Sequence, residues 1–278
     1  MGGVLDNAAR LSQEIWKCYK AMLYLFVAEL RRNWILLCRY PLQAISGMAL
    51  MFCLFLGIFT GVSYAGGSEF PRDGHLGSVV VGYLLWNAVV FAMGEIAEGL
   101  QGEARIGTIE QLYLSTSSGV SIFLARAVAS QTSTLLMTAG ILGLLIAITD
   151  VRLRFPLELI LPLVTAIAGA YGLGLIFGSM VMLFKKIGPL VQFAQFGVLA
   201  LVMVPFERIR PELANPFYLL PLVPGAALMR NLMARGQAMD WTVLGIATIN
   251  GGVYLCIGIF VFCWMERRTK SLGLLGSY

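Results

Sequence analysis

The stretch Trp241–Met265, WTVLGIATINGGVYLCIGIFVFCWM, contains no charged residue. A helix crosses the hydrocarbon core of a bilayer with about 20 mainly apolar residues, so this stretch is long enough to span a membrane. Basic residues follow it directly at Arg267, Arg268 and Lys270, as they do at the cytoplasmic end of a span. The stretch therefore predicts a membrane-spanning helix.

The composition of the whole chain agrees with this prediction. Hydrophobic residues make up 58% of the 278 residues and charged residues only 13%, with a mean hydropathy of +0.80. Soluble domains carry about 25% charged residues, and a chain of this size cannot bury so much apolar surface in one core. We therefore expect an all-α integral membrane protein with lipid as its apolar solvent.

Five more apolar runs have the length of a span. They are Pro41–Tyr64, Leu76–Gly94, Ser121–Thr149, Leu157–Phe184 and Ile187–Pro205. With the first stretch they predict six transmembrane helices in one domain, residues 1–278, with the bundle over 41–265 and a tail over 266–278. Most of the 20 basic residues then fall on one side, which the positive-inside rule assigns to the cytoplasm together with both termini.

Residues 10–32, before the first span, have the pattern of a basic amphipathic helix. Arg10, Lys17, Lys20, Arg31 and Arg32 share one arc of a helical wheel, and apolar residues fill the opposite arc. Such a helix lies in the interface and favours anionic headgroups. The alternative, a seventh span, leaves only a short apolar run between the charges.

Two other segments outside the spans are informative. Residues 206–240 are apolar and broken by prolines, which predicts two short helices that dip into the outer leaflet. Residues 98–118, EGLQGEARIGTIEQLYLSTSS, form a predicted cytoplasmic loop. Within this loop Thr108 is a candidate N-cap, and Glu110 and Gln111 then lie in the first turn of a short helix, where the helix dipole favours them.

The residues for several kinds of chemistry are missing. The sequence contains no GxxxxGK[ST] phosphate-binding loop, so we do not expect the chain to bind ATP through such a loop. One histidine and five scattered cysteines predict neither a catalytic site nor a metal site. Glu95 and Glu98 lie at the end of a span rather than deep within one, which argues against a carrier coupled to protons or sodium. We therefore expect a non-enzymatic chain without a cofactor of its own.

The segment Glu103–Leu112, EARIGTIEQL, resembles the cytoplasmic loop motif E-x3-G-T-[LI]-E-x-L of ABC-2 type exporter permeases. The interfacial helix, the six spans and the proline-broken outer hairpin are similar to the layout of that family, the type V exporters. A proline common shortly after the motif is Thr116 here, which affects only where the loop helix ends.

The resemblance implies a permease subunit in a prokaryotic inner membrane, working with a separate ABC ATPase that holds ATP and Mg²⁺. A second permease chain, identical or different, would complete the transporter, and nothing implies a nucleic-acid partner. The residues that would couple to the ATPase are Glu103, Arg105, Ile106, Gly107, Thr108, Ile109, Glu110, Gln111 and Leu112.

The cargo is less defined, because polar residues in spans more often bond a neighbouring helix than a substrate. They are Asn87, Gln131, Thr132, Ser133, Thr134, Gln192, Gln195 and Asn250. A mostly apolar pathway suits drugs, lipids or lipid-linked glycans, and no substrate site is assigned. The alternatives are a stand-alone secondary carrier, a membrane scaffold, or an exporter of a small cation.

Small residues also recur every four positions at Ala166, Ala170, Gly174 and Gly178, and at Gly57 and Gly61. Such ridges allow close approach of helix backbones. We expect packing within one bundle here, with a dimer contact as the alternative.

Overall fold

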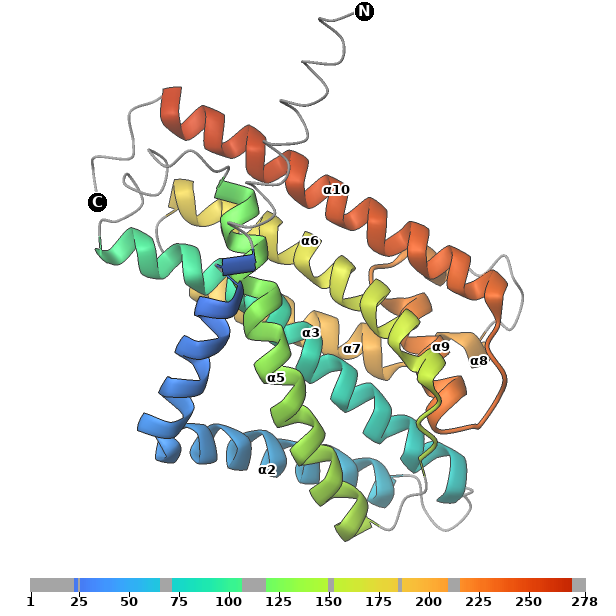
Figure 1. Cartoon of the computed structure of the whole chain (residues 1–278). Coiled ribbons are helices and arrows are strands. Elements are labelled where there is room, and N and C mark those ends of the chain that lie inside the picture. The colour runs from blue at the N-terminus through green and yellow to red at the C-terminus, as the bar shows by residue number, and fades with distance from the viewer. Residues whose placement is uncertain are drawn as a thin grey trace, which may run out of the picture.

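The computed structural model describes residues 23–24, 26–65, 72–106, 119–149, 153–184, 187–209 and 216–271. Across these residues the chain is helical and contains no strand. The helices are α2 (Pro41–Ala65), α3 (Arg72–Ile106), α5 (Gly119–Thr149), η1 (Leu157–Leu159), α6 (Ile160–Phe184), α7 (Gly188–Met203), α8 (Phe206–Ile209), η2 (Pro216–Leu219), α9 (Val223–Met233) and α10 (Trp241–Ser271) (Figure 1).

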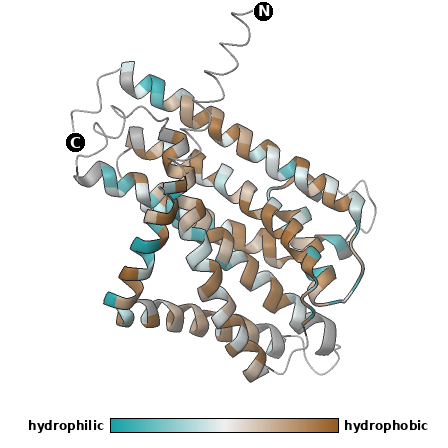
Figure 2. Ribbon diagram, in the orientation of Figure 1, coloured by the Kyte–Doolittle hydropathy of each residue, from teal (hydrophilic) through white to brown (hydrophobic). Residues whose placement is uncertain are grey.

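Four of these helices are long and apolar enough to cross a membrane: α3, α5, α6 with η1, and α10. Two shorter apolar helical segments, Ile45–Gly61 and Gly188–Met203, lie in α2 and α7. Large apolar side chains such as Leu136, Phe193 and Phe260 lie exposed on the outside of the bundle, and hydrophobic residues dominate the helices in Figure 2. Exposed apolar surface of this extent is typical of a multi-pass membrane protein.

The first span is preceded by a separate helix over residues 26–39, which we call the N-terminal helix. It ends before Tyr40, and α2 begins at Pro41, where proline suits the first turn of a helix. The two helices meet at a sharp corner (Figure 1). The predicted start of the first apolar run at Pro41 coincides with the start of α2, while residues 10–22 of the predicted interfacial helix lie outside the described residues.

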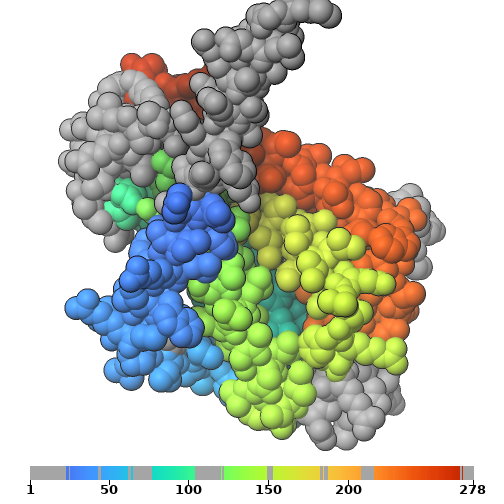
Figure 3. Space-filling view, in the orientation of Figure 1, coloured from blue at the N-terminus to red at the C-terminus, as the bar shows by residue number. Residues whose placement is uncertain are grey.

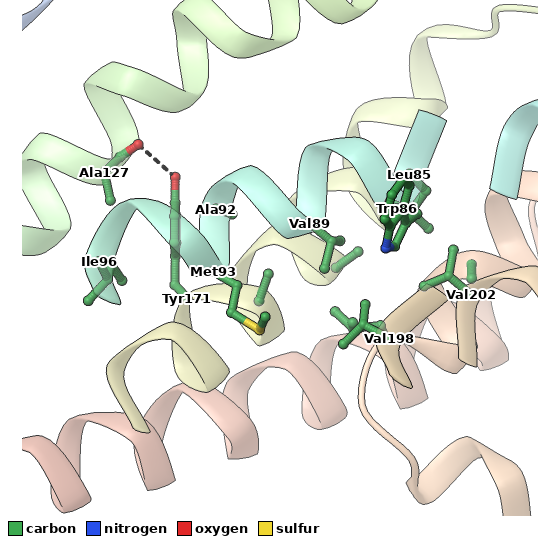
Figure 4. Packing of buried hydrophobic residues seen from close by; sticks show 14 of the residues in the cluster. Leu85, Trp86, Val89, Ala92, Met93, Ile96, Ala127, Tyr171, Val198 and Val202 are labelled. Atoms are coloured by element: carbon green, nitrogen blue, oxygen red, sulfur yellow. Dashed lines mark hydrogen bonds between the residues drawn. The ribbon is translucent and has the colours of Figure 1, made fainter. Parts of the chain in front are cut away.

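Helix α3 lies at the centre and is the most buried of the four long apolar helices. It packs against α5, α6 and α7. Its buried residues Leu85, Trp86, Val89 and Met93 form the main apolar cluster with side chains from the neighbouring helices (Figure 4). The Trp86 indole also donates a hydrogen bond to the Gln195 carbonyl of α7, at 3.0 Å.

Helices α6 and α10 make the most extensive contact in the molecule. A Cβ atom added at Gly172 would overlap the Tyr254 carbonyl, and one added at Gly258 would overlap the Gly172 carbonyl. The two backbones therefore touch directly, as glycines permit in membrane helices. Asp240 starts α10 by accepting hydrogen bonds from the Thr242 and Val243 amides at 2.9 and 3.2 Å.

The predicted ridge on the fourth span packs inside the bundle. A Cβ at Gly174 would lie 2.9 Å from the Met93 carbonyl oxygen, and one at Gly178 would lie 3.2 Å from Ile96. This face of α6 is thus covered by α3. The corresponding positions Gly57 and Gly61 of α2 have no atom within 4 Å of an added Cβ.

The segment between α7 and α10 contains the short helices α8, η2 and α9, in the region predicted to hold a proline-broken hairpin. Nearly all of α9 is buried, and it contacts α3, α6, α7 and α10. A surface loop would not be buried in this way.

At the other end of the bundle, α3 continues through Ile106, so residues 98–106 of the predicted cytoplasmic loop are helical. Glu, Ala and Arg are good helix formers, which explains this extension.

Candidate functional site

Arg126, near the start of α5, joins three elements at one end of the bundle. Its Nε donates a hydrogen bond to Glu29 Oε1 of the N-terminal helix at 3.0 Å. Its Nη1 donates another to Glu103 Oε1, near the end of α3, also at 3.0 Å. One guanidinium therefore ties α5 both to the N-terminal helix and to the last turn of α3.

The burial of this cluster makes its pairing necessary. The Glu29 side chain is 8% exposed, and those of Arg126 and Glu103 are about one-fifth exposed. A carboxylate withdrawn from water is costly unless it is paired and hydrogen-bonded. Glu29 also accepts a hydrogen bond from the exposed Arg32, at 2.9 Å, so two cations compensate its charge.

Two further carboxylates of α3 lie near the cluster. Glu95 lies beside the Ser130 hydroxyl of α5 and within the electrostatic reach of Arg32 and Arg126. Glu98 lines a cavity of about 380 Å³ between α3 and α7 with Gln101, Gln192 and Gln195. The C-terminal half of α3 thus carries carboxylates on two sides, one toward α5 and one toward α7.

The predicted coupling residues fall partly within the described part of the chain. Glu103 is paired with Arg126, and Arg105 and Ile106 belong to the last turn of α3. Gly107, Thr108, Ile109, Glu110, Gln111 and Leu112 lie outside the described residues. The motif therefore begins at the Arg126 cluster.

The sequence reasoning missed the roles of Glu29 and Arg126. The signal was present, because Arg126 is the one charged residue of the predicted span Ser121–Thr149 and Glu29 is an acid in a helix rich in basic residues. A charge in an apolar segment requires a partner. Two such charges of opposite sign at the same predicted end of the bundle are candidates for each other.

The polar residues predicted in the spans have different surroundings. Gln131 donates to the Ala88 carbonyl at 3.4 Å, and Asn250 donates to carbonyl oxygens of Tyr218 and Leu220 at 3.0 and 3.1 Å. These two amides hold helices together. Asn87 and Thr134 instead line a cavity between α2, α3 and α5, separate from the one that Glu98 lines.

A second ion-pair cluster lies beside α9 in the predicted outer hairpin. Arg230 is 1% exposed and donates to both carboxylate oxygens of Glu207, at 3.0 and 2.8 Å. Arg230 also donates to the Val202 carbonyl at the end of α7, and Arg235 donates to Glu207 at 3.1 Å. Burial would raise the pKa of Glu207, but the hydrogen bonds and charge of Arg230, with Arg235, lower it below its ordinary value. This cluster fixes α9 to the end of α7.

Comparison with known proteins adds no relative: no protein-family model matches the chain, and no curated protein matches it.

Proposed function

We propose that the chain is the permease subunit of an ATP-driven exporter. In this proposal α2 and α7 cross the membrane with the four long apolar helices, giving six spans with both termini in the cytoplasm of a prokaryotic cell. The chain would not hydrolyse ATP itself. A separate ABC ATPase would bind ATP and Mg²⁺, and two permease chains, identical or different, would form the pathway.

The observation that carries this proposal is the ion pair between Arg126 and Glu103. Glu103 is the first residue of the EARIGTIEQL segment, and Arg126 connects it to Glu29 of the N-terminal helix. A force applied to the loop after Ile106 would therefore reach α3, α5 and the N-terminal helix together. A coupling loop needs such a connection if closure of a soluble ATPase is to move the spans.

The cargo we propose is amphiphilic or hydrophobic: a drug, a lipid or a lipid-linked glycan. This suits a bundle with many exposed large apolar side chains, in which the carboxylates of α3 lie in its C-terminal half. A strongly polar cargo would need more fixed charge along the spans.

A second candidate is a stand-alone carrier, a membrane scaffold or an exporter of a small cation. The cavity between α3 and α7 favours transport of a polar solute, because Glu98 lines it with Gln101, Gln192 and Gln195. A carboxylate surrounded by amides suits a cation or a hydrogen-bonding solute.

The test is reconstitution with the ABC ATPase encoded by a neighbouring reading frame. We expect the two subunits to co-purify, and we expect the permease to change the ATPase rate in proteoliposomes. Arg126→Gln should lower that stimulation, whereas the exposed Arg267→Gln at the same end should leave it unchanged. A solute gradient that drives transport without ATP would instead support the carrier.

A further inference from the structure

A cavity of about 180 Å³ lies between α2, α3 and α5. Gly47, Met48, Met51, Asn87, Phe91, Thr134, Met137, Thr138 and Ile141 line it. The three methionines and the phenylalanine give it an apolar and adaptable wall. Its volume is below the roughly 300 Å³ at which pockets for drug-sized ligands begin, so an extended acyl chain fits it better than a bulky ligand.

One buried polar group in this cavity has an unused hydrogen-bond donor. Asn87 is 3% exposed, and its Oδ1 accepts a hydrogen bond from the Thr138 hydroxyl at 3.3 Å. Its Nδ2 forms no hydrogen bond of ordinary geometry among the described residues. Of its two protons, at most one points toward the nearby Tyr83 oxygen, and Tyr83 donates its own hydroxyl proton to the Met51 carbonyl. Burial of an unpaired amide proton is unfavourable, and an acceptor on a ligand would remove that penalty.

A second cavity of about 290 Å³ lies next to the first, on the side of the N-terminal helix. Both are lined by Thr134 and Met137. The second cavity is also lined by Asn33 and Tyr40, and by Ser130 and Ser133. It is therefore more polar at the end nearer to Arg126. In Figure 3 the N-terminal helix and α2, in blue, meet α5, in green, along this side of the molecule.

We propose that these two adjacent cavities together bind a single-chain amphiphile with a carbonyl acceptor near the head of its apolar chain. The apolar chain lies among Met48, Met51 and Met137, and the acceptor takes the free Nδ2 proton of Asn87. The polar end lies against the hydroxyls of Ser130 and Ser133. The order of polar and apolar groups along α5 matches the order in such a molecule.

This inference deepens the proposed function by placing the cargo, and it is tested on the permease alone, without an ATPase. Its failure is therefore distinct from a failure of coupling. Whether the cavities recognise the polar head of the amphiphile, or apolar chains of the bilayer merely fill them, is decided by the comparison of two probes below.

The probe is a monoacylglycerol with a photoactivatable diazirine and an alkyne tag on its acyl chain. The matched probe is a hydrocarbon of equal length with the same groups but no ester or glycerol. Each is added to the permease in phosphatidylcholine nanodiscs, illuminated, and mapped by mass spectrometry. We expect the monoacylglycerol to label peptides with Met48, Met51 or Met137 several-fold more than the hydrocarbon does. Equal labelling by both probes would mean that bilayer chains merely fill the space, and would overturn the proposal.

Two pairs of variants separate the site from general effects on the fold. Asn87→Leu should reduce monoacylglycerol labelling about three- to tenfold, the range for one lost neutral hydrogen bond. Gln131→Leu removes a buried amide of the same helix pair that is already bonded and lines neither cavity, and it should change labelling less than twofold. Gly47→Leu should fill the cavity of about 180 Å³ and reduce labelling. Gly57→Leu, at a position of α2 that is equally free of steric contact, should leave that cavity open and labelling unchanged. Unchanged labelling in folded Asn87→Leu or Gly47→Leu would overturn the assignment.

Discussion

The Arg126 guanidinium and the Glu103 carboxylate are 3.0 Å apart, and this contact joins the start of α5 to the last turn of α3. Both helices are long enough to cross a membrane, so the segment between them leaves and re-enters the bundle beside this ion pair. In the proposed transporter, a partner bound to that segment would pull on an ion-pair cluster that also includes Glu29. The stability of this cluster would then affect how the spans respond.

Removing Arg126 should destabilise the chain more than removing an exposed arginine. Arg126→Met leaves Glu103 without this cation and leaves Glu29 with only the exposed Arg32, and breaking a buried pair costs on the order of 3 kcal/mol. The double variant Arg126→Met, Glu29→Leu should recover part of the loss, because the more buried of the two carboxylates that lost Arg126 is then absent. Thermal unfolding in detergent measures both, with Arg267→Met as the exposed control. Additive losses in the double variant would mean that the two residues do not interact.

The contact between α6 and α10 should be intolerant of one methyl group. In Gly172→Ala the new Cβ meets the Tyr254 backbone, which cannot move aside as a side chain can. We expect a loss of about 1–3 kcal/mol, the usual cost of overpacking. Gly252→Ala, on α10 with open space around it, should be neutral or slightly stabilising because alanine favours helix. Equal stability of the two variants would show that the backbones do not touch here.

Acid should weaken the hairpin that contains α9. Burial alone would raise the pKa of Glu207, but the hydrogen bonds and charge of Arg230, a backbone hydrogen bond and the charge of Arg235 together lower this pKa in the folded chain. Its contribution is then fully present above the unfolded pKa of about 4.5 and is lost as pH falls through the lower folded pKa. Unfolding midpoints measured from about pH 7 down to about pH 3 should show an acid decline. Glu207→Gln should be less stable near neutrality, and its decline should be shallower.

Six spans with both termini in the cytoplasm give a direct labelling prediction. In a variant without the five native cysteines, single cysteines at Ser271 and Ser68 should react with a membrane-impermeant reagent from opposite sides. The end of α10 and the predicted first outer loop carry these positions. Labelling of both from the same side would mean an even number of crossings between them, whereas the six-span topology requires five, and would contradict that topology.

The helices could be predicted from the sequence because each depends on its own composition. The apolar run Trp241–Met265 needs no partner to be recognised, and it lies within α10. The Arg126–Glu29 pair could not be assigned in the same way, because 97 positions separate the two residues and only the packing of α5 against the N-terminal helix brings them together. The extension of α3 to Ile106 was missed because polar residues such as Glu98 and Gln101 suit a loop and an exposed helix equally well.

Coupling to the ATPase is the prediction on which the proposed function depends most. The loop around Gly107–Leu112 is predicted to lie in the cytoplasm, and its apolar residues Ile109 and Leu112 need a protein partner to cover them. Glu110→Lys should repel the docking groove through its reversed charge, and Gly107→Pro should distort the backbone that leads into the loop helix.

Both variants should insert and fold as the wild type does, because neither changes the bundle, yet they should uncouple transport from ATP hydrolysis. Size-exclusion profiles and thermal unfolding report the fold, while a pull-down of the ATPase and its rate in proteoliposomes report coupling. Ser271→Lys, which adds a positive charge to the exposed end of α10 on the same side, serves as the control and should behave as wild type. If Glu110→Lys and Gly107→Pro both bind the ATPase and transport normally, the loop does not dock, and the chain is then better described as a carrier or scaffold that works without an ATPase.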